Sequence, residues 1–326
     1  MQWRSVCLLA DPRPNRLQGR SSPLLKTFAR LKEYAATGES FVHLSDGDMA
    51  RLHSVLLDML ADFHRLCSDH GLTYMLTGGS ALGAARCGGI IPWDDDIDIA
   101  MPRADYEQLA GIVAREYADR YWVQSLATSE KCDLNFIKLR KLGTKYVELY
   151  EQEPEKAGIC LDIFPLDDAP DNPLVRVLHG LVDEALFLAA SCVRMYQKRE
   201  RLLKHIKDER LSGTIRLKCL LGRLLNSHKA PRKWYLRCES WCRRLNDPNS
   251  RYLVVSCGRG HYFGELYERS KILPPSPTVF QGQESYLPGD NHHLLSVLYG
   301  ENYLEVPDDA RRETHALLEL SFGPEE

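Results

Sequence analysis

Residues 93–99, WDDDIDI, place four carboxylates within five positions of an apolar stretch. These are Asp94, Asp95, Asp96 and Asp98. In a strand, alternate side chains share a face, so Asp94, Asp96 and Asp98 should project together while the isoleucines enter the core. Carboxylates this close cannot all stay ionised unless a cation joins them. Oxygen ligands suit Mg²⁺ or Mn²⁺, so we predict that Asp96 and Asp98 hold such a cation.

The other two carboxylates are predicted to support this site. Asp94 lies at the strand entrance, where it would orient the site or the loop. Asp95 points the other way and is expected to pair with a nearby arginine. A calcium-binding EF-hand loop is the competing interpretation, but its sixth position requires glycine, which here is Ile99.

A third carboxylate, Asp162, lies in GICLDIFPLDD between apolar strand residues. An unpaired buried acid is costly, so Asp162 is expected to meet a cation. The cation held by Asp96 and Asp98 is the natural candidate. Three carboxylates on neighbouring strands predict a two-metal phosphoryl-transfer site, in which Asp162 would share a metal and could accept the proton of an attacking hydroxyl.

The segment TGGS, residues 77–80, precedes the acidic segment. Adjacent glycines that lead into a helix let backbone amides approach a phosphate. We therefore predict that Gly78, Gly79 and Ser80 bind a phosphate of the substrate. The segment matches neither the G-x-G-x-x-G fingerprint nor a P-loop.

Basic side chains near these segments are candidates for offsetting phosphate charge. Lys138 and Arg140 alternate in FIKLRKLGT, so both would face the same cleft. Arg86 and Arg103 flank the acidic segment and either join in substrate binding or pair with its carboxylates. An ordinary exposed strand face would explain Lys138 or Arg140 taken singly.

These residues require a framework of helices and strands. Apolar positions at helical spacing predict a helix over 45–70, and shorter helices over 80–86 and 103–118. Strands are expected over 72–76, 96–101, 135–142, 146–150 and 159–166. Helical patterns dominate from 173 to 245. The order predicts an α/β (α+β) fold with a mixed sheet and a large helical insertion or subdomain.

We divide the chain accordingly into four parts. Residues 1–45 are expected to form a poorly ordered extension with one short helix. The core spans 46–172, a basic helical subdomain 173–250, and a C-terminal segment that packs on the core 251–326.

Charge is unevenly distributed along the chain. The net charge is −3, yet residues 194–244 contain 16 Lys/Arg and 4 Asp/Glu. Such a segment fits an anionic partner or simply a solvated helical face. Nucleic acid is not expected, because aromatic residues are not interleaved in a known binding motif. We find neither a signal peptide nor a membrane span, which predicts a cytoplasmic protein, at most peripheral to the inner membrane face.

Ten cysteines are scattered singly, without a C-x-x-C pair, as expected for reduced thiols. Cys238, Cys242, Cys257 and His261 are loosely spaced like zinc ligands. The first two also lie on the apolar stripe of an amphipathic helix, which is the simpler interpretation.

Residues 77–109, TGGSALGAARCGGIIPWDDDIDIAMPRADYEQL, resemble the signature block of the LicD family within the nucleotidyltransferase superfamily. FIKLRKLGT, LDIFPLDD and residues 286–315 extend the resemblance over roughly 50–315. It implies transfer of a phospho-alcohol, such as phosphocholine, from a CDP-linked donor to a glycan hydroxyl or its lipid-linked precursor. The resemblance also implies a role in glycan modification, in lipopolysaccharide or teichoic acid biosynthesis. Asp96 and Asp98 match the family's metal-binding D-x-D, and Asp162 matches its DIFPL block.

Two alternatives remain at this stage. One is a nucleotidyltransferase that moves a nucleoside monophosphate onto a small molecule. The other is a non-catalytic module that binds glycans or lipid headgroups, against which the three retained carboxylates argue.

Overall fold

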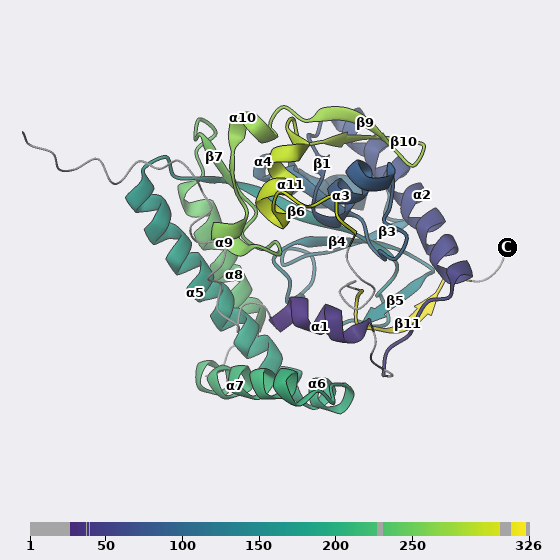
Figure 1. Ribbon diagram of the computed structural model, residues 1–326, viewed down its shortest axis with the longest axis vertical. Coiled ribbons are helices and arrows are strands. Elements are labelled where there is room, and N and C mark those ends of the chain that lie inside the picture. Colours follow the sequence, from purple (N-terminus) through teal and green to yellow (C-terminus); the bar gives the residue numbers. More distant parts are fainter. Residues whose placement is uncertain (1–26, 37, 39, 227–230, 307–313, 324–326) are drawn as a thin grey trace, which may run out of the picture.

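The computed structural model describes residues 27–306 and 314–323, except 37, 39 and 227–230 (Figure 1). Its centre is a mixed sheet, in which five strands lie in the order β1, β2, β6, β4, β3. Their bounds are Met75–Leu76, Asp98–Pro102, Cys160–Ala169, Ile137–Lys141 and Tyr121–Gln124. Only β2 and β6 run parallel among these pairs. The predicted α/β class with a mixed sheet is confirmed.

Two long helices pack against the sheet. Helix α2, Asp46–His70, begins with a reciprocal capping box between Ser45 and Asp48. It ends at Gly71, whose φ of 64° is the left-handed conformation that glycine tolerates. Helix α4 spans Arg103–Glu116. The apolar faces of both helices and the strand residues form the largest core cluster, as the helical spacing predicted.

The helical subdomain lies at one end of the molecule (Figure 1). It contains α5 (Pro173–Gln197), α6 (Arg199–His205), α7 (Glu209–Leu225) and α8 (Pro231–Cys242). Asn172 caps α5, and Pro173 occupies its first turn, where no backbone amide donor is needed. Within the described residues, no helix combines the length and apolar content needed to cross a membrane.

The last part of the chain returns to the core. β7 (Tyr252–Val254) pairs with β6, and β8 (Leu266–Glu268) pairs with β7. Between and beyond them lie α9 (His261–Gly264), α10 (Arg269–Ile272), the β9–β10 hairpin (Ser276–Phe280 and Gln283–Leu287) and α11 (Asn291–Tyr299). Finally, β11 (Leu317–Ser321) pairs with β5 (Lys145–Glu148). This return brings residues near 315 beside residues near 95.

Two further helices border the acidic segment. Helix α1, Thr27–Ala35, falls where one short helix was expected. Helix α3 spans Gly78–Cys87 and follows β1 directly. Several expected boundaries differ from the observed ones by up to three residues. The strand predicted over 72–76 begins only at Met75. The strand predicted to begin at Asp96 begins at Asp98, because residues 91–94 form a turn in which Asp94 N donates to Ile91 O.

Candidate active site

Asp96, Asp98 and Asp162 lie together at one end of the parallel strand pair. Asp98 is the first residue of β2 and lies directly opposite Asp162 in the register with β6. Asp96 lies in the loop just before β2. One carboxylate oxygen from each residue lies within 4.8 Å of the others. The three predicted ligands are therefore close enough to bind one cation.

The electrostatics of this cluster favour a cation. Burial, reinforced by the neighbouring Asp96 carboxylate, raises the pKa of Asp98 to about 8. Burial and then Asp96 also raise the pKa of Asp94 well above its usual range. The described basic residues thus do not supply enough positive charge to balance these carboxylates. The all-oxygen donor set is of the type that suits Mg²⁺ or Mn²⁺.

The TGGS segment contacts the carboxylates directly. The Gly79 amide donates to Asp98 Oδ2 at 3.2 Å, and Ser80 Oγ accepts from the Asp98 amide at 2.9 Å. A Cβ atom on Gly78 would lie 2.4 Å from Asp98 Oδ2, and one on Gly79 would lie 2.6 Å from Asp94 Oδ2. The glycines therefore make room for the acids. Gly78 and Gly79 also line the cavity described below, whereas Ser80 is buried behind it.

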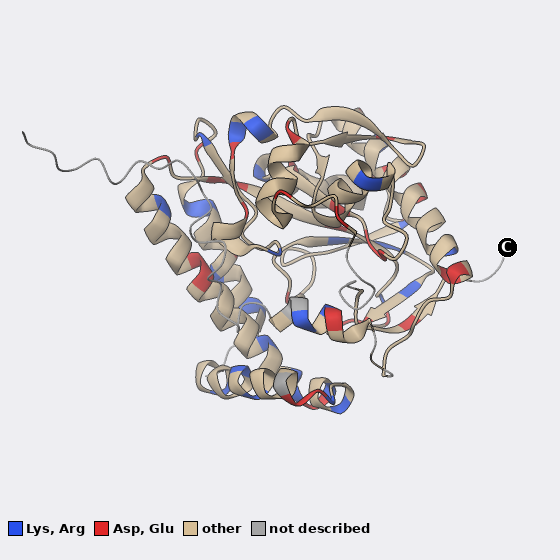
Figure 2. Cartoon of the chain, viewed as in Figure 1, with Lys and Arg blue, Asp and Glu red and all other residues tan. Residues whose placement is uncertain are grey.

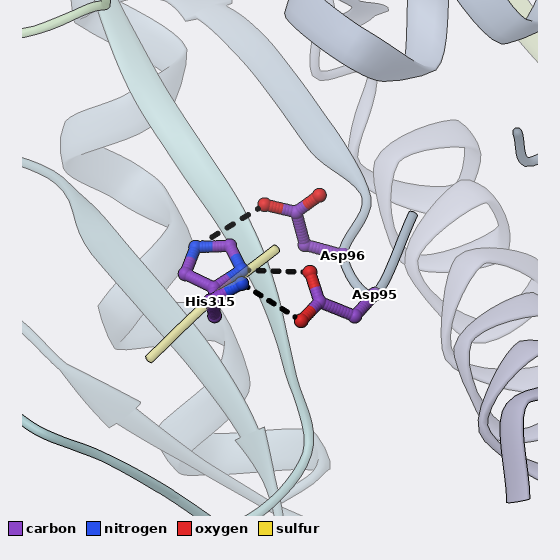
Figure 3. A group of neighbouring side chains, drawn as sticks. All are labelled: Asp95, Asp96 and His315. Atoms are coloured by element: carbon purple, nitrogen blue, oxygen red, sulfur yellow. Dashed lines mark hydrogen bonds and ion pairs between the residues drawn. The ribbon is translucent and has the colours of Figure 1, made fainter. Parts of the chain in front are cut away.

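Asp95 pairs with a histidine rather than with an arginine, so that expectation is wrong (Figure 3). Its Oδ1 lies 2.8 Å from His315 Nδ1, and its Oδ2 accepts from the Tyr146 hydroxyl at 2.7 Å. Burial alone would raise the pKa of Asp95, but the charge and hydrogen bonds of His315, with Tyr146, lower it to about 2. His315 Nε2 lies 3.5 Å from Asp96 Oδ2, so the imidazole joins both carboxylates.

Lys138 and Arg140 take different places. Lys138 lies opposite Asp162 on β4, and its Nζ is 3.0 Å from Asp162 Oδ1 and 3.2 Å from Glu148 Oε2. Burial opposes its charge, yet Asp162 and its neighbours raise the pKa of Lys138 well above its usual range. Arg140 is fully buried, and its guanidinium contacts Gln124, Glu151 and Gly158 O. Among the described cavity-lining residues we find Lys138 but not Arg140.

The two flanking arginines also differ. Arg86 lines the cavity and donates through Nε to Tyr303 O at 2.9 Å, which fastens residues 303–305 to α3. Arg103 lies elsewhere: its Nε and Nη2 donate to Asp167 Oδ1 and Oδ2 at 2.8 and 2.6 Å. Arg103 therefore ties α4 to β6 and leaves the acidic segment to other partners.

The carboxylates form part of the wall of a cavity of about 1520 Å³. Distant segments complete this wall: residues 30–33 of α1, the exposed start of α5, residues 257–261 and residues 297–306. Lys32 of α1 reaches within 3.9 Å of Asp96. Lys32, Glu148, Arg259 and His315 also line the cavity, although the sequence did not mark them as site residues. Of these, only His315 lies in a segment that resembles the family, and it is the last residue of that segment.

The four residues with zinc-like spacing do not assemble into a cluster of ligating atoms in the described part of the chain. Cys238 and Cys242 lie on the buried face of α8, as expected for an amphipathic helix. The Cys242 thiol donates to Asp183 Oδ1 at 2.9 Å, and Cys257 belongs to the cavity wall.

Comparisons with known proteins bear on this site. Residues 71–172 match the family described as "LicD/FKTN/FKRP, nucleotidyltransferase domain", a range that contains all three carboxylates. The chain is also 31% identical over 270 residues to the lipopolysaccharide cholinephosphotransferase LicD of Haemophilus influenzae. That alignment covers 81% of this chain and 94% of the relative. The chain belongs to the LicD family.

Similarity to a second LicD-family member is more local. Over 52 residues the chain is 50% identical to the ribitol 5-phosphate transferases FKRP of mouse and human. This stretch is 15% of this chain and 10% of each relative. By their names, both kinds of relative transfer a phosphate that carries a small alcohol.

Proposed function

We propose that this protein transfers a phospho-alcohol, such as phosphocholine, from a CDP-activated donor to a hydroxyl of a cell-surface glycan or its lipid-linked precursor. The observation that carries the proposal is the cluster of Asp96, Asp98 and Asp162, with oxygens within 4.8 Å, on the wall of a large cavity. Membership of the LicD family supports it, because the named activities of the relatives are of this class.

The reaction joins the acceptor hydroxyl oxygen to the phosphorus that carries the alcohol. The bond from that phosphorus to the oxygen of CMP breaks, CMP leaves, and the hydroxyl proton passes to a carboxylate. Asp162 is our candidate acceptor of that proton, since it lines the cavity and the ion pair with Lys138 fixes its orientation. We expect an in-line displacement, which depends mainly on positioning and electrostatics.

Mg²⁺ or Mn²⁺ held by Asp96, Asp98 and Asp162 would neutralise charge on the phosphates of the donor. The protein's own residues do the rest of the positioning. Gly78 and Gly79 line the cavity, and their backbone at the start of α3 is our candidate contact for the donor's phosphates. Ser80 Oγ accepts from the backbone amide of Asp98 and so fixes this residue. Arg86 holds residues 303–305, which form another part of the cavity wall.

Incubation with CDP-choline, CDP-ribitol and related CDP-alcohols tests the proposal, with Mg²⁺ and a glycan or glycolipid acceptor present. We expect CMP release together with an acceptor that gains the mass of the phospho-alcohol. Asp98→Asn should reduce this activity by roughly a thousandfold or more. Asp58→Asn, an exposed aspartate on α2, makes the same change of charge and should retain activity.

Three outcomes would contradict the proposal. Full activity in Asp98→Asn would remove the carboxylates from the mechanism. An acceptor that gains a nucleoside monophosphate would identify a nucleotidyltransferase instead. Binding of a glycan without CMP release from any donor would indicate a binding module.

A further inference from the structure

The outer face of α7 combines leucine and arginine side chains. Leu217, Leu220 and Leu224 are 48%, 57% and 72% exposed, and their spacing of three and four residues places them on one face. Arg216 and Arg223 are exposed beside them. We call these five residues the α7 face. An exposed aliphatic row flanked by arginines is typical of helices that lie in a membrane interface.

The opposite side of α7 is well anchored, so the exposure does not reflect a loosely held helix. Ile215 is fully buried in the cluster that α7 shares with α1 and α5, and Lys218 Nζ lies 2.9 Å from Ser191 Oγ. A Cβ on Gly222 would lie 2.1 Å from Cys192 O, so the two helix backbones are in close contact. The α7 face is thus a fixed surface of the helical subdomain.

The start of α5 carries a second aliphatic row. Leu174 and Leu178 are 76% and 65% exposed, and Val177 and Leu181 are also exposed. Val177 and Leu181 also line the cavity that holds the carboxylates. An apolar surface therefore leads from the outside of the subdomain to the cavity. Contiguous exposed aliphatic residues on this scale mark an interaction site in a soluble domain.

The charge of the subdomain indicates what this surface contacts. Residues 194–244 carry an excess of 12 positive charges, counted as 16 basic minus 4 acidic residues. Arg194, Lys198 and Lys218 of this set are buried, and basic positions recur along α6 and α7 (Figure 2). A second copy of the chain, packed with two-fold symmetry, would bring the same arginines of both α7 faces together, which is unfavourable. An anionic lipid surface instead accepts the arginines at its headgroups and the leucines at the acyl boundary.

We propose that the helical subdomain docks on an anionic phospholipid bilayer through the α7 face and the exposed row of α5. This mode is peripheral, in accord with the lack of a membrane-spanning helix among the described residues. It deepens the proposed function: an acceptor whose lipid chain remains in the bilayer would meet the cavity at Val177 and Leu181. Vesicle binding can be measured without any turnover, so it is separable from the proposed activity.

Co-sedimentation of the full chain tests the docking, with vesicles of phosphatidylcholine alone or mixed with phosphatidylglycerol. We expect the wild type to bind the mixed vesicles and to be released by added salt. Arg216→Gln with Arg223→Gln should weaken binding to the mixed vesicles about thirtyfold. Leu217→Ser with Leu220→Ser should weaken it roughly tenfold or more, as should Leu174→Ser with Leu178→Ser.

Matched controls lie on other surfaces of the molecule. Arg65→Gln with Arg115→Gln, exposed on α2 and α4, makes the same change of net charge. Val279→Ser removes an aliphatic side chain of 65% exposure on the β9–β10 hairpin. Both controls should bind as the wild type does, and all variants should keep the wild-type unfolding temperature.

Wild-type protein that stays in the supernatant with both vesicle types would overturn the proposal. Test variants that bind as tightly as their controls would do the same. A dimer in analytical ultracentrifugation that dissociates on the leucine substitutions would assign the surface to a second copy of the chain.

Discussion

At the scale of single residues, the candidate site depends on small side chains as much as on charged ones. Gly78 and Gly79 lie so close to Asp98 and Asp94 that a methyl group would collide with a carboxylate oxygen. The same glycines allow the Gly79 amide to donate to Asp98. The identity of these glycines is therefore coupled to the placement of the acids.

Gly79→Ala should reduce transferase activity roughly a hundredfold, because the new methyl group would displace Asp94, whose movement disturbs the reacting geometry beside Asp98. The helix itself should tolerate alanine, which is a better helix former than glycine. Steady-state kinetics alongside thermal unfolding separates the two effects. Gly111→Ala on α4 is the control, since its Cβ would meet only Arg115 Nη1, at 3.5 Å. Equal activity in both variants would show that the close approach is unimportant.

Some site residues could be predicted from the sequence, and others could not. Asp96, Asp98 and Asp162 stand out because each is a carboxylate within an apolar strand pattern, which is a local signal. His315 has no such signal: it reaches Asp95 across 220 positions, and only the folded chain brings the two together. The alternation of Lys138 and Arg140 indicates that they share a strand face, but it does not show which residues cover that face. The burial of Arg140 away from the cavity could therefore not be predicted.

At the scale of elements, the long periodic helices and most strands of the core were predictable, whereas the short strands near the C-terminus were not. The spacing of Leu52, Leu56 and Phe63 identified α2 without reference to the rest of the chain. By contrast, β7 and β8 have three residues each, and β11 depends on pairing with β5, some 170 positions earlier. A strand of that length acquires its stability from a partner that the local sequence does not specify.

The packing of α5 against α8 contains a buried carboxyl group with consequences for stability. Asp183 on α5 accepts from the Cys242 thiol of α8. Burial, opposed by that hydrogen bond and reinforced by Asp167 and Glu184, raises the pKa of Asp183 from 3.8 to about 7. The folded state therefore holds a proton that the unfolded state releases at a lower pH. The resulting stabilisation is complete below about pH 4 and is lost as the pH rises through about 7.

Asp183→Asn should remove this pH dependence, because asparagine is neutral and its Oδ1 still accepts from Cys242. The variant should be more stable than the wild type at pH 8, by at most about 4 kcal/mol, and the difference should shrink toward pH 5. Urea unfolding at several pH values between 5 and 8 measures this difference in the free energy of unfolding. Asp58→Asn, with an exposed side chain, should leave the pH profile unchanged. A constant difference between Asp183→Asn and the wild type across this range would refute the protonation argument.

At the scale of the whole molecule, the cavity connects parts of the chain that are far apart in sequence. Six carboxylates surround its acidic end: Asp94, Asp95, Asp96, Asp98, Glu148 and Asp162. Lys32, Lys138 and His315 are the nearby basic groups among the described residues, and with them the fully charged described set would carry −3. Folding brings these charges together, and this repulsion opposes the folded state. A bound cation should therefore stabilise the entire fold.

Addition of Mg²⁺ or Mn²⁺ should raise the unfolding temperature, and chelation should reverse the change. At a free cation concentration a hundredfold above Kd, linkage contributes about 2.7 kcal/mol, which corresponds to several degrees. Differential scanning fluorimetry at constant ionic strength measures this change in unfolding temperature without substrate. Asp98→Asn with Asp162→Asn should abolish the response, and Asp58→Asn should keep it. A similar rise in the unfolding temperature of the Asp98→Asn, Asp162→Asn double variant would place the cation elsewhere.

The pairing of β11 with β5 has a consequence for the order of events during synthesis. Residues 315–321 supply both a strand partner for β5 and the imidazole beside Asp95. A ribosome that has made the first 300 residues has already produced the three carboxylates, but their histidine neighbour is still untranslated. Contacts of such sequence separation form late in folding. The site of a growing chain therefore lacks the imidazole beside Asp95 and the strand partner of β5. Both can be in place only after residues 315–321 have been translated.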